Sequence, residues 1–478
     1  MDTNSNSVTN ILSITEKLES KSLLSISRHE WRWPLMFLLS MSLTGLNFPL
    51  GYIGIIVVLV NRFINDKYDF IICLTLLFGG YALLSDEDFP IKLQDIALSI
   101  SVVGVFIYKK TPELKKVTIL LFAYALALVL IAKTSDETMA IQLRRLRGYL
   151  MIVYFFVPLM AFSGKEFDIK YFFKKLMIYA LIICWFYIID GFILNGWVLL
   201  PDAANQYEYS STFTNLIWYP FQFTFPRKYP PGLYLLALCL FPVMKYYKLS
   251  IKQWIVVILA FAATRTLSVI GGLLIAYVIF QGHFKVVAKY ATIAIVVVSS
   301  LYFVDRFTGS FLRIQSTIDQ FISLNAVQDE EDLAEFGSGR MSQIIPKMEV
   351  LYDLDREWLG LGFLHPELTT NPKYWIKNEL YSDVTKAEEV ATAVEVSAIQ
   401  TILDVGYLGL ILQTFFYIGV YYIIRHLKYA RYYLIAFVVI SIFGIGGFAG
   451  VTTHHGLLLV ALSLAVVFIA NKSYNKVQ

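Results

Sequence analysis

The chain has 478 residues, of which 57% are hydrophobic and 16% are charged, and its formal net charge is +4. Soluble domains are less apolar and carry about 25% charged residues, so this composition excludes an ordinary soluble domain. The small positive charge gives no indication of nucleic-acid binding. The sequence therefore predicts an all-α polytopic membrane protein with about 14 transmembrane helices.

The chain divides into five predicted segments. They are a cytoplasmic or interfacial N-terminal segment (1–32), a membrane domain with an exterior loop at 193–228 (33–304), a large, partly helical exterior (periplasmic) loop domain (305–395), C-terminal membrane helices (396–470) and a cytoplasmic tail (471–478). The apolar runs predict spans at 33–47, 49–62, 68–85, 92–108, 117–132, 148–163, 172–192, 229–245, 251–264, 267–281, 287–304, 396–424, 431–448 and 455–470.

Basic residues in the short loops set the predicted orientation. With the N-terminus inside, runs such as "KKTPELKK" (109–116) and "GKEFDIKYFFKK" (164–175) lie on the cytoplasmic side, as the positive-inside rule requires. One short exterior loop, 133–148, breaks this pattern because it carries Arg144, Arg145 and Arg147. Either the topology differs there and the arginines reach lipid head groups, or they bind a polyanion at the exterior face.

The exterior segment 193–228 is dense in aromatic and hydroxyl side chains. Trp218 and Tyr219 could stack on sugar rings, or they could belong to an aromatic belt at the membrane interface. Arg227 and Lys228 are expected close to lipid phosphates.

Arg265 lies in the apolar stretch "FAATRTLSVIGG" (261–272). Residues 251–281 run between two lysine-bearing loops that are both predicted inside, and they span only roughly 45 Å as helix. We therefore expect two short helices joined near 264–266, with Arg265 facing a wet cavity open to the exterior. The alternatives are a structural arginine paired with a carboxylate and a functional cation.

Three motifs follow in order: "GSGR" ending at Arg340, "WLGLG" at 358–362, and "VEVSAIQTILDVGYLGLIL" at 394–412 with Glu395 and a Gly406–Gly409 step. Together with Thr264 before Arg265, this order resembles the bacterial O-antigen polymerase and O-antigen ligase superfamily. Ligases of that family usually open the last helix with a histidine-asparagine pair. Here Glu395 and Val396 take that place, which favours a polymerase.

The resemblance implies a metal-independent glycosyltransferase that needs no cofactor. Its substrate would be an oligosaccharide linked to polyprenyl (undecaprenyl) diphosphate at the outer face of the bacterial inner membrane, polymerised into O-antigen, capsule or a similar surface polysaccharide. A chain-length regulator and a flippase are the implied partners. Arg265 and Arg340 are expected to hold the diphosphate, because guanidinium groups pair bidentately with phosphate.

A general base is also needed for the attacking hydroxyl. Glu395 is the candidate, although a glutamate at a helix N-terminus is also explained by the helix dipole alone. His454 and His455 lack companions at metal-ligand spacing, so packing, hydrogen bonding or substrate contact is expected of them. "YDLDREW", with Asp353 and Asp355, is interpreted as a solvated acidic face.

Other functions remain open from the sequence. A ligase would transfer the finished glycan to an acceptor, and a transporter or flippase would move the lipid-linked oligosaccharide. The single large exterior loop and the absence of an internal repeat argue against a transporter.

Overall fold

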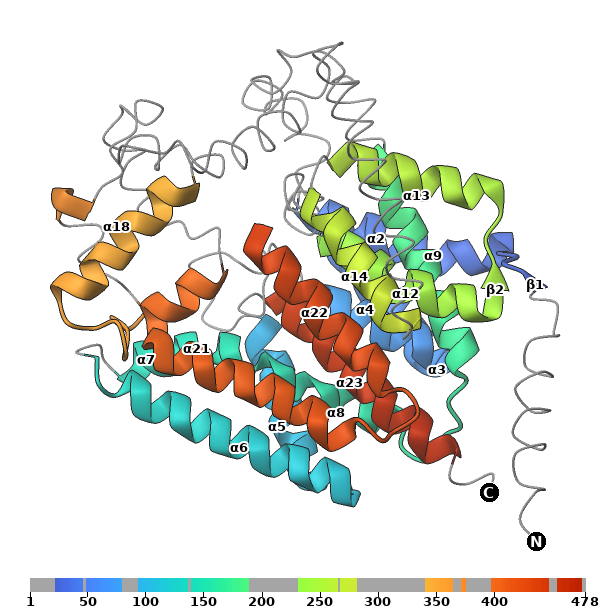
Figure 1. Ribbon diagram of the computed structural model, residues 1–478. Helices are drawn as coiled ribbons and strands as arrows, with labels where there is room; N and C mark the ends of the chain where they lie inside the picture. Colours follow the sequence, from blue (N-terminus) through green and yellow to red (C-terminus); the bar gives the residue numbers. More distant parts are fainter. Residues whose placement is uncertain are drawn as a thin grey trace, which may run out of the picture.

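The structure is a computed structural model that describes residues 22–45, 49–79, 93–135, 139–188, 231–264, 267–281, 340–363, 371–374, 397–446 and 454–474. Nearly all of them are helical, which confirms the all-α class (Figure 1). The strands within these ranges are β1 (Ser22–Leu23) and β2 (Tyr247–Lys248), which pair in parallel. They join the segment before the first helix to the end of α12.

The helices follow one another along the chain with short connections. The first half contains α2 (Arg28–Gly45), α3 (Pro49–Asn65), α4 (Lys67–Gly79), α5 (Leu93–Ile107), α6 (Pro112–Ala132), α7 (Met139–Leu150), the 3₁₀ helix η1 (Met151–Phe155), α8 (Phe156–Ala161) and α9 (Ile169–Ile188). The second half contains α12 (Pro231–Tyr246), α13 (Ile251–Thr264), α14 (Leu267–Gln281), α18 (Arg340–Asp353), η5 (Pro372–Tyr374), α21 (Ser397–Ile424), α22 (Ala430–Gly446) and α23 (His454–Tyr474).

The C-terminal helix α23 lies at the centre of the core. Every residue from 456 to 470 is buried, because this helix is apolar on all sides and packs against η1, α22 and α4. Helix α9 is similarly enclosed and packs against α12 and α13.

Helices α6 and α21 form a long antiparallel pair. Glu113 at the start of α6 lies 3.4 Å from His426 beyond the end of α21, and Tyr124 stacks on Phe416 with ring centroids 4.5 Å apart. The start of α6 is fixed by Thr111, whose hydroxyl accepts a hydrogen bond from the Leu114 N–H. With 21 and 28 residues, these two helices are long and apolar enough to cross a membrane, as judged by length and composition.

Two predicted features differ from the structure around residues 133–163. The predicted loop 133–148 is largely helix α7, because its Ala, Gln, Leu and Arg residues are good helix formers. The predicted span 148–163 is interrupted by η1. Pro158 has no N–H to donate to the carbonyl of Tyr154, which removes one α-helical hydrogen bond at this point.

The prediction of two short helices within 251–281 is confirmed. Helix α13 ends at Thr264 and α14 begins at Leu267. Arg265, predicted at the joint between them, lies outside the described residues.

Helix α21 is broken at Gly406, whereas the sequence predicted one continuous span. A turn formed by residues 357–362, called the inserted turn below, lies against the break. In a regular helix the N–H groups of Tyr407 and Leu408 would donate to the carbonyls four residues earlier. Here they donate to the inserted turn, at 2.9 Å to the carbonyl of Glu357 and 3.2 Å to that of Trp358.

The carbonyl groups released by the break are satisfied by the same turn. Leu361 N–H donates to the Leu403 carbonyl at 2.7 Å, and Gly362 N–H donates to the Asp404 carbonyl at 3.2 Å. The turn therefore replaces two helical hydrogen bonds with four bonds of its own, and no backbone group of the break at these positions is left without a partner.

Glycines make this close approach possible. Gly406 has φ 68° and ψ −177°, and a Cβ there would overlap the backbone of Trp358 and Leu359. Gly360 has φ 76°, and its Cβ would come within 2.6 Å of the Asp404 carbonyl carbon and the Val405 nitrogen. Both positions demand glycine because of their backbone conformation and because of the space available.

Replacing Gly406 with alanine should lower the free energy of unfolding by at least about 3 kcal/mol, because strain at positive φ adds to a backbone overlap. Gly164→Ala is the matched control, since Gly164 also has positive φ (79°) but no atom lies within 4 Å of the place that a Cβ would take. That control should cost only about 1 kcal/mol. Unfolding by SDS in mixed micelles measures both, and equal losses would contradict the inserted turn.

Candidate functional site

A buried carboxylate lies immediately before the break in α21. Asp404 is only 6% exposed. Its Oδ2 accepts a hydrogen bond from the Tyr149 hydroxyl at 2.7 Å, and its Oδ1 accepts one from the Gln400 side-chain amide at 2.6 Å. An ionised carboxylate only accepts hydrogen bonds, so two donors fix its position and stabilise its charge.

Three elements meet at this carboxylate. Tyr149 comes from the last turn of α7, and its ring lies 6.3 Å from that of Phe363, directly after the inserted turn. Gln400 precedes Asp404 by one helical turn. The site therefore joins α7, the inserted turn and the first part of α21, three segments that are far apart in the sequence.

Arg147 is the one predicted α7 arginine whose side chain is described. It forms an ion pair with Asp95 of α5 at 2.6 Å, and the two side chains are 15% and 32% exposed. The pair fastens α7 to the start of α5. Because its charge is countered, Arg147 is less available for a polyanion than the sequence suggested.

The inserted turn is held at its other end by α6 and α18. Arg356 donates to the carbonyl of Thr134, just beyond α6, at 2.9 Å. Val350 and Leu351 of α18 form a small core with Ile402 and Leu403 of α21. Helix α18 begins at Arg340, so the chain leading from that predicted arginine is packed onto the site (Figure 1).

Polar groups continue from the site into the interface of α6 and α21. The Thr401 hydroxyl donates to Gln413 Oε1 at 3.4 Å. Three further buried atoms, Tyr124 Oη, Gln413 Nε2 and Tyr417 Oη, have no hydrogen-bond partner among the described residues. Buried polar groups of this kind are commonly satisfied by water, so this interface is suited to hold it.

The other predicted site residues are placed in part. Six of them lie outside the described residues: Arg265, Glu395, Arg227, Lys228, Trp218 and Tyr219. Five are described by their backbone alone: Arg144 and Arg145 within α7, Arg340 at the start of α18, and His454 and His455 at the start of α23. Of the predicted groups, the "WLGLG" motif and the Gly406 step are in direct contact.

Asp404 and Tyr149 were not singled out in the sequence. Asp404 is the only acidic residue of the 28-residue helix α21, and a lone carboxylate in an apolar helix is a signal of function. Tyr149 gave no such signal, because its role depends on a hydrogen bond across 255 positions of the chain.

The "YDLDREW" segment is solvated at Asp353, as predicted. Hydrogen bonds from Lys373 (2.6 Å) and Tyr374 (2.8 Å) lower the pKa of this exposed carboxyl below its ordinary value. Across the described ranges, no group of three or more histidine, cysteine, aspartate or glutamate side chains is arranged to hold a metal ion.

Comparisons with known proteins gave no match: no family model, no curated protein and no solved structure is similar to the chain. The geometry of the site and the chemistry of its residues therefore carry the functional argument.

Tyr149→Phe removes a donor from a buried carboxylate, so it should destabilise the protein by about 1.5–3 kcal/mol. Tyr433→Phe is the control, because the Tyr433 hydroxyl is equally buried but donates to a neutral acceptor, the Tyr417 carbonyl, at 3.2 Å. It should cost about 1 kcal/mol. Unfolding in mixed micelles compares the two, and an equal or smaller loss for Tyr149→Phe would argue against a charged Asp404.

Proposed function

We propose that the protein is a membrane-embedded glycosyltransferase that polymerises oligosaccharide repeat units carried on polyprenyl diphosphate. The observation that carries the proposal is the inserted turn seated in the break of α21, with Asp404 and Tyr149 beside it. The two motifs on which the family resemblance rests thus meet at one place.

A multi-pass placement in the bacterial inner membrane is part of the proposal. Large apolar side chains face outward on several helices: Phe106 of α5 is 76% exposed, Ile64 of α3 is 71% exposed and Phe415 of α21 is 67% exposed. Apolar surface of this extent is unfavourable in water and suits contact with lipid. Several shorter apolar helices accompany α6 and α21, which is consistent with about 14 spans in all.

The break in α21 supports a functional site within such a membrane domain. Non-helical backbone at membrane depth is tolerated only where protein or water surrounds it, and the inserted turn supplies that protein. Discontinuous helices of this kind commonly position polar groups around a substrate. We place the site at the exterior face, because the large loop that contains α18 is predicted on that side.

The proposed reaction breaks the bond between the anomeric carbon of the growing glycan and its lipid diphosphate. A hydroxyl at the non-reducing end of the next lipid-linked unit forms the new glycosidic bond. Its proton passes to Glu395, the proposed base, and the lipid diphosphate leaves with the electron pair.

Arginines stabilise the charge that develops on the diphosphate. Arg265 and Arg340 are the proposed first contacts, with Arg144 and Arg145 of α7 assisting near the site. Asp404 acts as a positioning residue, because its hydrogen bonds hold Tyr149 and the first part of α21 in place.

The test is polymerisation by the purified protein in nanodiscs, supplied with a lipid-diphosphate-linked repeat unit from its own pathway and no metal. A ladder of product lengths is expected. Arg265→Ala should abolish the ladder, and Asp404→Asn should lower its rate by about 100-fold because a small misplacement of reacting groups costs that much. Asp353→Asn, a solvated carboxyl of the same exterior segment, is the control and should leave the rate unchanged.

Other outcomes separate the alternatives. Transfer of a preformed glycan to an acceptor, without a ladder, would make the protein a ligase. Translocation of the lipid-linked unit across vesicles, without any new glycosidic bond, would make it a transporter. A normal ladder from Arg265→Ala would refute the assignment of that arginine.

A further inference from the structure

A second polar site lies at the other end of the helical body, where α2 begins beside β1, away from α7 and α18 (Figure 1). A cavity of about 440 Å³ opens between the first turn of α2, the α3–α4 junction and the first part of α9. Its mouth is formed by exposed side chains, including His29 and Asn65, and its floor by buried charged groups. None of these residues takes part in the proposed transfer reaction.

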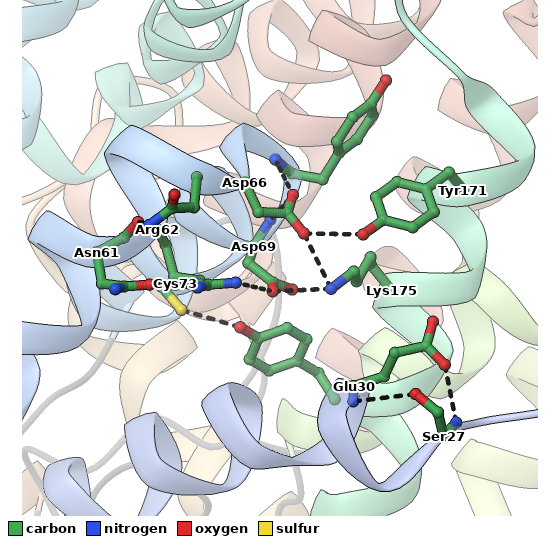
Figure 2. A network of polar contacts seen from close by, with 12 residues as sticks. Ser27, Glu30, Asn61, Arg62, Asp66, Asp69, Cys73, Tyr171 and Lys175 are labelled. Carbon is green, nitrogen blue, oxygen red and sulfur yellow. Dashed lines mark hydrogen bonds and ion pairs between the residues drawn. The ribbon is translucent and has the colours of Figure 1, made fainter.

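The floor is a network of ions centred on Lys175 (Figure 2). The Lys175 ammonium lies 3.0 Å from Asp66 Oδ2 and 2.9 Å from Asp69 Oδ2. The Tyr171 hydroxyl also donates to Asp66 Oδ2, at 2.9 Å. Both carboxylates are therefore held rigidly by α9, while Asp66 also caps the start of α4.

Arg62 forms the second fixed cation of the floor. Its guanidinium lies over the Trp33 ring at 4.4 Å and is hydrogen-bonded to Asn61, with Asp69 Oδ2 at 3.6 Å. Stacking and hydrogen bonding together orient this charge before any ligand arrives.

One acceptor on the floor is left over. Asp69 is fully buried and lines the cavity, yet its Oδ1 has no hydrogen-bond partner in the described part of the chain. An unpaired oxygen of a buried carboxylate is costly, and a ligand that brings an N–H or O–H group to it recovers that cost. The network already uses Oδ2, so a ligand at Oδ1 need not displace Lys175.

The charge of the wall favours a cation as that ligand. Three carboxylates and two permanent cations line the cavity, which leaves one negative charge in excess when His29 is neutral. At the mouth, Glu30 is paired with Lys174 at 2.6 Å, so a single cation inside the cavity balances the remaining wall.

We propose that this cavity binds the primary ammonium group of an amine-bearing phosphate, of the kind carried by ethanolamine head groups. The ammonium donates to Asp69 Oδ1, and the phosphate lies outward near His29 at the mouth. A choline group has the same charge but no N–H, so it cannot satisfy Oδ1. Discrimination between these two amines follows directly from the unpaired oxygen.

The same chemistry can come from a phospholipid or from a free phosphorylated amine. The lipid source rests on the membrane placement proposed above, and the site at the α21 break plays no part in it. Binding is measured without glycan substrate, so failure of the polymerase proposal would leave this test valid.

The experiment measures thermal unfolding of the full chain in detergent as lipid is added, with native mass spectrometry to count bound lipids. The probes are phosphatidylethanolamine, phosphatidylcholine of the same acyl chains, and soluble phosphoethanolamine. A ligand that binds only the native state raises the unfolding temperature in a saturable way. Phosphatidylethanolamine should do so, and phosphatidylcholine should not.

Three variants locate the effect. Asp69→Asn should weaken phosphatidylethanolamine binding by about tenfold or more, the loss of a charged hydrogen bond. His29→Ala, at an exposed position, should weaken it less and guards against misfolding of the buried variant. Glu113→Gln removes a carboxyl that lies outside the cavity, in the His426 pair, and should change nothing.

Equal binding of the ethanolamine and choline lipids would overturn the proposal, as would unchanged binding in both cavity variants. Saturable binding of soluble phosphoethanolamine with the same dependence on Asp69 would support the site and identify a free ligand as its source.

Discussion

Four backbone hydrogen bonds between the inserted turn and the two halves of α21 hold the candidate site together. A broken helix exposes N–H and C=O groups, and each would cost several kcal/mol if buried without a partner. The turn satisfies them only because Gly360 and Gly406 bring the two backbones into contact. Everything else at this end depends on that contact: it fixes Asp404 at the end of a helical segment, within reach of Tyr149, and it docks α18 through the core around Leu351 and Leu403.

The molecule concentrates its buried charge at two ends with different consequences. At the break in α21, Asp404 is held by neutral donors, and α7 brings arginines to the same region. At the other end, Lys175 is clasped by two carboxylates and Arg62 is stacked on Trp33. The first arrangement leaves cations for an anionic substrate, which is the basis of the transferase proposal. The second leaves a spare carboxylate oxygen, which is complementary to a donor.

Sequence patterns predicted the helical class and the pair α13–α14, because apolar run length and the spacing of lysine loops are local properties. The same patterns predicted α21 as continuous. Nothing within its apolar run shows that Gly406 breaks it, since the break exists only with a partner turn from another part of the chain. Likewise, the arginines of 133–148 suggested a loop although the segment is helical, and Lys175 was interpreted as a topology marker although it lies 106 positions from its partner Asp69. Long-range pairing of this kind cannot be deduced from composition.

The central claim is that the inserted turn in the break of α21 forms one wall of the site for a lipid diphosphate. The most direct measurement is a cryo-EM structure of the protein in nanodiscs with the lipid-diphosphate-linked repeat unit bound. We expect diphosphate density beside α7 and the inserted turn, with the turn still bonded to residues 403–408. Density confined to the opposite end of the molecule, or a continuous α21 with the turn elsewhere, would contradict the claim.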